Sequence, residues 1–239
     1  MNIGFEYIKY RWNAKGRHGI HSPFVFDLVT KCLYDKKKYP EYSILKNYRK
    51  ALLQNKNTIE VTDFGAGSKV FKSNTRAINQ IAKTAGISSK RAKLLFRMAR
   101  YFQPTTILEI GTSLGLATSA LSLGNKNAKI TTLEGCANTQ AIAKELFQVS
   151  GFKFPTNNIK FVTTEFKAFL NNLKPETWNL KPDLSESELS KQTWNLKPET
   201  LNLKPHLVYF DGNHSKDATL NYFELLLPTT TNETVWIFD

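Results

Sequence analysis

The sequence has few cysteines and no long apolar run, and these absences exclude several classes of protein. Cys32 and Cys136 are the two cysteines among 239 residues, too few and too far apart in sequence for a disulfide framework or a zinc site. Charged residues interrupt the apolar positions of residues 1–24, so a signal-peptide core is missing there. No other apolar run is long enough to cross a bilayer. We therefore expect a cytoplasmic protein without a membrane partner.

Acidic residues are scarce relative to basic ones. The 20 Asp and Glu stand against 33 Lys and Arg, which gives a net charge of +13 and favours contact with nucleic acid or another anionic surface. The densest basic groups, Lys36–Lys38 and Lys90–Lys93, lack the interleaved aromatic residues of a single-strand-binding groove. Solvated helix faces therefore explain them better. An RNA substrate is the alternative, and salt-sensitive binding to RNA would identify it.

Residues 1–100 are predicted to form an N-terminal helical region. Apolar residues recur at spacings of three and four between Phe24 and Cys32 and again between Ala92 and Ala99. Ser22–Pro23 and Ser88–Ser89 are predicted helix starts, because serine caps free amides and proline suits the first helical position.

From Thr105 onward, short apolar runs alternate with helical stretches, which is the pattern of a parallel sheet with crossover helices. The predicted strands are 106–110, 129–133, 159–162, 207–210 and 235–238. Residues 101–239 are therefore predicted to form a doubly wound, Rossmann-like α/β domain.

A repeated phrase interrupts this domain between the third and fourth predicted strands. Asn-Leu-Lys-Pro begins at residues 172, 179, 195 and 202. Proline in every copy forbids one continuous helix, and the polar residues between copies offer little to bury. We expect residues 173–204 to form an inserted surface loop. The alternative is a partner-docking arm that uses Trp178 and Trp194.

The strongest functional signal is the segment from Glu109 to Gly115, where an apolar strand gives way to a helix. A sharp strand-to-helix turn needs glycine, and a backbone without Cβ lets a ligand approach the helix N-terminus. The glycines Gly111 and Gly115 stand four apart, unlike the G-x-G-x-x-G spacing of dinucleotide-binding folds, which disfavours a nicotinamide dehydrogenase. Glu134 ends the second predicted strand, where an acidic residue accepts hydrogen bonds from ribose hydroxyls in nucleotide-binding folds.

Two other segments carry weaker signals. Thr62–Ser68 contains two glycines, but Ile59–Val61 makes a poor strand before it, so we expect a loop. His18 and His21 have no carboxylate or cysteine partner nearby in sequence, and we expect them to serve packing or capping, with a place facing the site as the alternative.

Taken with Asp211–His214 (Asp-Gly-Asn-His), the Glu109–Gly115 turn and Glu134 resemble class I methyltransferases, particularly the catechol and caffeoyl-coenzyme A type O-methyltransferases. The resemblance covers about residues 102–239. It implies S-adenosylmethionine as cofactor, a small-molecule acceptor, and N-terminal helices on the acceptor side. The cofactor-binding residues that it implies are Glu109 at the methionine end, Gly111, Thr112, Ser113 and Gly115 at the turn, Glu134 at the ribose, and Asp211.

The same resemblance predicts where catalysis takes place. In the metal-dependent members, an aspartate at the position of Asp211 binds magnesium, and a lysine three residues later removes the acceptor proton. This sequence has His214 there, which is a competent general base, while Lys216 is a weaker candidate. Asp211 and Asp239 alone supply few oxygen ligands for magnesium, so the sequence does not decide whether a metal ion binds.

Family members also continue with two more strands, forming a hairpin at the sheet edge. The sequence stops at Asp239, so we expect these C-terminal strands to be missing. A truncated remnant that binds cofactor without turnover is accordingly the second alternative. The acceptor identity and the oligomeric state stay open.

Overall fold

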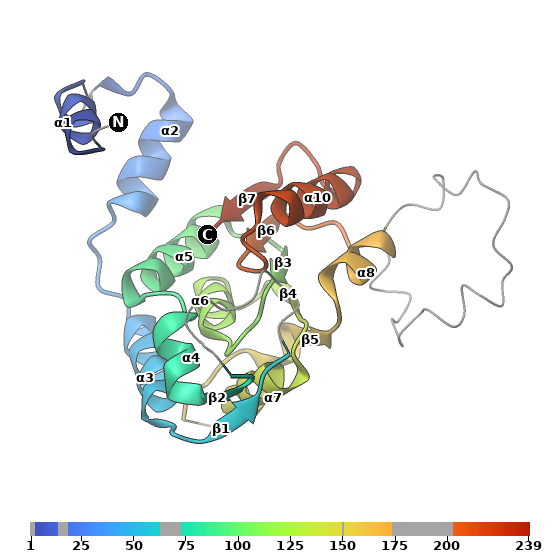
Figure 1. Cartoon of the computed structure of the whole chain (residues 1–239). Coiled ribbons are helices and arrows are strands. Elements are labelled where there is room, and N and C mark those ends of the chain that lie inside the picture. The colour runs from blue at the N-terminus through green and yellow to red at the C-terminus, as the bar shows by residue number, and fades with distance from the viewer. Residues whose placement is uncertain (1–2, 14–18, 63–72, 150, 174–202) are drawn as a thin grey trace, which may run out of the picture.

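The computed structural model describes residues 3–13, 19–62, 73–149, 151–173 and 203–239 (Figure 1). His18, the glycines of the Thr62–Ser68 segment and most of the repeat-containing segment lie outside these ranges. Within the described residues, no helix is both long and apolar enough to span a bilayer.

Helices and strands occupy most of the described chain. The α-helices are α1 (Ile3–Asn13), α2 (Pro23–Leu28), α3 (Glu41–Gln54), α4 (Ile78–Thr84), α5 (Ser89–Phe102), α6 (Leu116–Gly124), α7 (Ala137–Gln148), α8 (Phe166–Asn171) and α10 (Lys216–Leu226). A π-helical stretch (Val29–Leu33) continues α2, and 3-10 turns lie at Thr156–Asn158 and Leu227–Thr229. The strands are β1 (Thr58–Glu60), β2 (Thr75–Ala77), β3 (Thr106–Ile110), β4 (Lys129–Glu134), β5 (Ile159–Thr163), β6 (Leu207–Phe210) and β7 (Val235–Phe238).

Serine caps begin the helices where the sequence predicts them. The Ser22 hydroxyl accepts the Val25 N–H at 3.4 Å, with Pro23 as the first residue of α2. The Ser88 hydroxyl accepts the Arg91 N–H at 3.3 Å and starts α5. Both predicted helix starts are confirmed.

The expectation that Ile59–Val61 makes a poor strand is wrong in part. Residues 58–60 form β1, which pairs antiparallel with β2, and Ile59 lies opposite Arg76. The Val61 N–H extends the pairing by donating to the Asn74 carbonyl at 2.9 Å. The partner strand lies about 15 residues away along the chain, so local sequence gave no sign of it. The N-terminal hundred residues therefore contain a small sheet besides their helices.

The main sheet has five parallel strands in the order β5-β4-β3-β6-β7. All five strands were predicted, with bounds correct to one residue. β3 lies at the centre, with β4 on one side and β6 on the other (Figure 1). The order in which strands are added therefore reverses at β3, although all five strands are parallel. Open α/β sheets bind their ligands at the carboxyl ends of the strands at such a point. The doubly wound, Rossmann-like fold is confirmed.

Helices cover both faces of this sheet, because side chains alternate between its faces along each strand. One apolar cluster joins Ile107, Ile130 and Leu207 to α3, α4, α5, α6 and α7. The second cluster lies on the opposite face of the sheet, where Leu108 and Val208 pack against α8 and α10. The two clusters together form the three-layer core that holds the strand ends in place.

The ends of the repeat-containing segment are anchored in the second cluster. Leu173 is 2% exposed, Leu203 packs against the same cluster, and the Lys204 carbonyl accepts the Thr106 hydroxyl at 2.7 Å. Leu173, Leu203 and Lys204 therefore contact the folded core, so the predicted loop bounds of 173 and 204 are too wide.

Deleting residues 174–202 and joining the ends with a short Gly-Ser linker is expected to leave the fold intact. Loop closure costs grow slowly with length, so the melting temperature should fall by less than about 4 °C, or about 1 kcal/mol. Deleting 173–204 is the matched comparison, and it should cost ~2–5 kcal/mol through the loss of the buried leucine. Circular dichroism melts would measure both. A large fall after the shorter deletion would show that the repeats pack on the core.

Candidate active site

A sharp turn joins the end of β3 to the start of α6. Gly111 has φ of +103°, and a Cβ added there would lie 2.4 Å from the carbonyl oxygen of Asp211. The N–H groups of Gly111 and Thr112 both donate to the Leu133 carbonyl at 2.9 Å. Glycine is therefore required by the backbone conformation and by the close approach of the loop after β6.

Two helices hold the far side of the turn. Gly115, the N-cap of α6, has φ of +77°, and a Cβ there would lie 2.8 Å from Tyr48 Oη and 2.9 Å from Phe147. The buried Tyr48 on α3 donates its hydroxyl to the Leu114 carbonyl at 2.8 Å. The turn is thus fixed by α3 and α7 as well as by its own glycines.

Glu109 is a fully buried carboxylate directly before the turn. Its Oε2 accepts the Thr118 hydroxyl at 2.6 Å, whereas Oε1 is buried without a hydrogen-bond partner among the described residues. Burial raises the pKa of Glu109 to about 8. An unpaired buried carboxylate oxygen is costly, and a bound cation or hydrogen-bond donor would relieve that cost.

Glu134 ends β4 and faces the same turn. Its Oε2 accepts the Ser113 N–H at 2.7 Å, and its Oε1 accepts the Cys136 N–H at 2.9 Å. Burial raises its pKa, while these backbone donors oppose the shift. Each carboxylate oxygen has two acceptor sites, so Glu134 can still accept hydrogen bonds from a ligand.

Residues Gly111–Gly115 also match G-x-S-x-G, which is the sequence pattern of the nucleophile elbow in hydrolases. Ser113 has φ of +47°, which matches the strained serine of such an elbow. A nucleophilic serine needs a base within hydrogen-bond reach. In the part of the chain that the structure describes, the Ser113 hydroxyl has no hydrogen bond to a histidine, and its backbone N–H is committed to Glu134. The geometry favours a ligand-binding turn.

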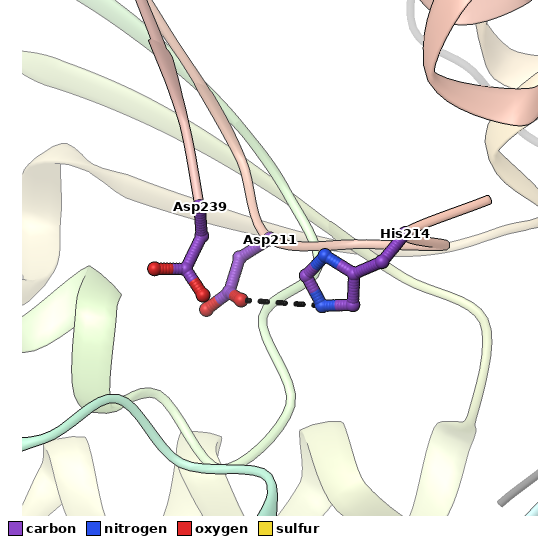
Figure 2. Close-up of side chains that lie close together, drawn as sticks. All are labelled: Asp211, His214 and Asp239. Atoms are coloured by element: carbon purple, nitrogen blue, oxygen red, sulfur yellow. Dashed lines mark ion pairs between the residues drawn. The ribbon is translucent and has the colours of Figure 1, made fainter. Parts of the chain in front are cut away.

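A second group of polar side chains follows β6 and β7. Figure 2 shows the Asp211 and Asp239 carboxylates side by side, with the His214 imidazole approaching Asp211. His214 Nε2 lies 4.0 Å from Asp211 Oδ1, and one donor atom from each of the three residues lies within 4.8 Å of the others. Adjacent parallel strands bring them together, because Phe210 of β6 lies opposite Phe238 of β7. The structure therefore joins the two predicted catalytic residues, Asp211 and His214, to Asp239.

Charge repulsion and burial act on this cluster. Burial, followed by the neighbouring carboxylate of Asp239, raises the pKa of Asp211 to about 7. The His214 side chain is 63% exposed, whereas that of Asp211 is 14% exposed. A solvent-facing imidazole beside a partly buried carboxylate can exchange protons with a bound molecule and with water.

Arg91 is a member of this cluster that sequence reasoning missed. It lies on α5, and its Nη1 is 2.8 Å from Asp239 Oδ1. The two residues are 148 positions apart, so no local pattern could have paired them. This salt bridge partly neutralises the paired carboxylates.

The remaining predicted candidates lie elsewhere. Lys216 is exposed at the first position of α10. His21 is exposed before α2, and Ser22 rather than His21 caps that helix, so the expectation that His21 serves packing or capping is wrong. Ser215 caps α10 by accepting the Ala218 N–H at 3.3 Å. A cavity beside the cluster, lined by His214, Asp239 and neighbours, has a volume of ≈ 30 Å³ and admits a water-sized group.

The chain is similar to known proteins in sequence and in fold. A family model described as a methyltransferase domain matches residues 108–239, which is more than half of the chain. A search of curated proteins finds no match.

Two solved structures show a similar fold. The methyltransferase PaMTH1 of Podospora anserina, bound to S-adenosylhomocysteine, aligns with a TM-score of 0.55 and 16% identity over 92% of this chain and 70% of that chain. The O-methyltransferase TomG of Streptomyces achromogenes, in complex with S-adenosylmethionine, aligns with a TM-score of 0.51 and 16% identity over 90% of this chain and 71% of that chain.

Proposed function

This chain belongs to the methyltransferase-domain family, and from that premise we propose that it transfers the methyl group of S-adenosylmethionine to a hydroxyl of a small organic acceptor. The S-adenosylhomocysteine bound to PaMTH1, the S-adenosylmethionine bound to TomG and the O-methyltransferase activity named for TomG support this choice of chemistry. The observation that carries the proposal is the buried Glu109 carboxylate before a glycine turn, whose Oε1 has no hydrogen-bond partner among the described residues.

The residues at the turn fit this cofactor. S-adenosylmethionine supplies a methyl group activated by a sulfonium, together with an ammonium group and ribose hydroxyls. Glu109 Oε1 would accept a hydrogen bond from the ammonium, and the free acceptor sites of Glu134 would take the ribose hydroxyls. Gly111 and Thr112 would line the methionine end, and Ser113 and Gly115 would shape the turn toward α6.

His214 is proposed as the general base that removes the acceptor hydroxyl proton. Asp211, 4.0 Å away and less exposed, would stabilise the imidazolium that forms. In-line methyl transfer needs positioning and proton removal, and these residues lie at the carboxyl edge of the sheet where the cofactor turn also lies.

Magnesium fits the cluster poorly. Asp211 and Asp239 supply two carboxylates, one of which is already paired with Arg91, and the third side chain is an imidazole. Magnesium prefers oxygen ligands, whereas imidazole suits transition metals. The proposed methyl transfer therefore uses no metal ion.

Two measurements test the function. Calorimetry should show binding of S-adenosylmethionine or S-adenosylhomocysteine and no binding of NAD. A methyl-transfer assay against a panel of phenols, with and without EDTA, should then show transfer that survives chelation. Binding without transfer to any acceptor would favour a cofactor-binding remnant, and salt-sensitive RNA binding with RNA methylation would favour the RNA alternative.

Replacing Glu109 with glutamine is expected to change cofactor affinity and stability in opposite directions. The loss of a charged hydrogen bond, worth about 1.5–3 kcal/mol, should weaken S-adenosylmethionine binding by ~10–100-fold. Between the ordinary pKa of 4.5 and about 8, the folded protein holds the Glu109 proton more tightly than the unfolded chain. The unliganded wild type should therefore lose stability as pH rises through this range.

The glutamine variant has no such titration, so its melting temperature should exceed that of the wild type at pH 8.5 and approach it near pH 4.5. Glu145→Gln, which changes an exposed glutamate on α7, is the matched control. Equal cofactor affinity in wild type and Glu109→Gln would remove Glu109 from the binding site.

A further inference from the structure

A second pocket lies between α3, α5 and the first turns of α6, with a volume of ≈ 210 Å³. Its floor is apolar and consists of the buried Leu45, Ile87, Ala92 and Leu116. It shares no lining residue with the cluster of Asp211, His214 and Asp239. The methyl-transfer chemistry therefore leaves this pocket unexplained.

Three cationic side chains, Lys46, Arg49 and Lys93, line the pocket. The half-buried Arg49 guanidinium donates to the backbone carbonyls of Ile87 and Ala82, which are neutral. Lys93 Nζ lies 5.1 Å from the centre of the Tyr42 ring, which is also neutral. Among the described residues, none of the three cations forms a salt bridge with a carboxylate.

Uncompensated positive charge beside an apolar wall attracts an anion more strongly than the same charge in open solvent, because the wall excludes water. The apolar floor, in turn, favours a ligand with an apolar body. The volume is below the ~300–1,000 Å³ of pockets for drug-sized ligands, so one or two fused rings would fill it.

We propose that this pocket is a binding site for a small arylcarboxylate, separate from the methyl-transfer site. The ring lies on the apolar floor beside Tyr42, and the carboxylate faces the ammonium groups of Lys46 and Lys93. Arg49 adds its positive charge from the wall, where its two carbonyl bonds hold it in place.

The test uses calorimetry on the full chain at low salt with 1-naphthoate as the probe. We expect 1-naphthoate to bind at least tenfold more tightly than the neutral 1-naphthamide, and saturating S-adenosylhomocysteine to leave its affinity unchanged. The double variant Lys46→Ala/Lys93→Ala, which removes two exposed side chains, should weaken naphthoate binding about tenfold or more. Lys90→Ala, an exposed lysine of α5 that does not line the pocket, should bind like the wild type.

Ala92→Leu provides an independent test, because its added methyl groups would occupy the cavity without changing the charge. This variant should lose naphthoate binding while keeping the wild-type melting temperature within a few degrees. Equal affinity for the acid and the amide, or an unchanged affinity in the double variant, would overturn the proposal. Competition by S-adenosylhomocysteine would place the probe in the cofactor site and overturn it as well.

Discussion

Replacing Gly111 with valine is expected to abolish cofactor binding. The backbone at Gly111 has φ of +103°, which L side chains rarely adopt, and a Cβ there would overlap the Asp211 carbonyl at 2.4 Å. The carbonyl is backbone and cannot rotate away as a side chain would, so β3 or the loop after β6 must move. Both carry residues that we place at the cofactor and the acceptor.

The strained backbone and the steric overlap together determine how much cofactor affinity and stability this variant should lose. A β-branched residue in this region is a steric outlier, and an overlap in a packed core costs ~1–3 kcal/mol or more. Calorimetry should detect no S-adenosylmethionine binding, and the melting temperature should fall by several degrees. Gly151→Val is the matched control, because a Cβ at Gly151 meets nothing within 4 Å. Undiminished affinity in Gly111→Val would contradict the assignment of the turn as the cofactor site.

Replacing His214 with alanine is expected to lower the rate of methyl transfer by ~10²-fold or more, as for the loss of a general base. Cofactor affinity should barely change, because His214 is exposed and is not among the residues that we place at the cofactor. Single-turnover rates at saturating S-adenosylmethionine would measure the chemical step, and calorimetry would measure the affinity.

Two further readouts separate a base from a residue that merely shapes the site. Imidazole added to the His214→Ala assay should restore part of the rate, since it can take the acceptor proton in solution. His21→Ala, which alters an exposed histidine before α2, should keep the wild-type rate. Equal activity in His214→Ala would remove His214 from the mechanism, and loss of wild-type activity on chelation would contradict proton removal without a metal ion.

The parallel sheet could be predicted because each of its strands is a short apolar run that local sequence displays. The turn was also predictable, since Gly111 and Gly115 are required by local backbone conformation. The β1-β2 pair escaped prediction, because a three-residue strand is stabilised by its partner rather than by its own residues.

The site was predictable only where its residues are neighbours in sequence. Asp211 and His214 are three residues apart and lie close together in the fold, whereas Arg91 reaches Asp239 only after the chain has folded. The state of the Glu109 carboxylate is likewise a property of packing, because only the three-dimensional arrangement shows that Thr118 donates to one oxygen and that the other has no partner in the part of the chain that the structure describes.

The hydrogen bond from Tyr48 to the Leu114 carbonyl ties an N-terminal helix to the backbone of the proposed cofactor turn. Local opening of α3 would leave that carbonyl without its partner and uncover the tight contacts around Gly115. Any ligand that binds only the ordered turn must therefore suppress the opening of α3 as well, by mass action. We therefore expect α3 and the turn to open together, so that a cofactor bound at the turn would slow hydrogen exchange in α3 as well.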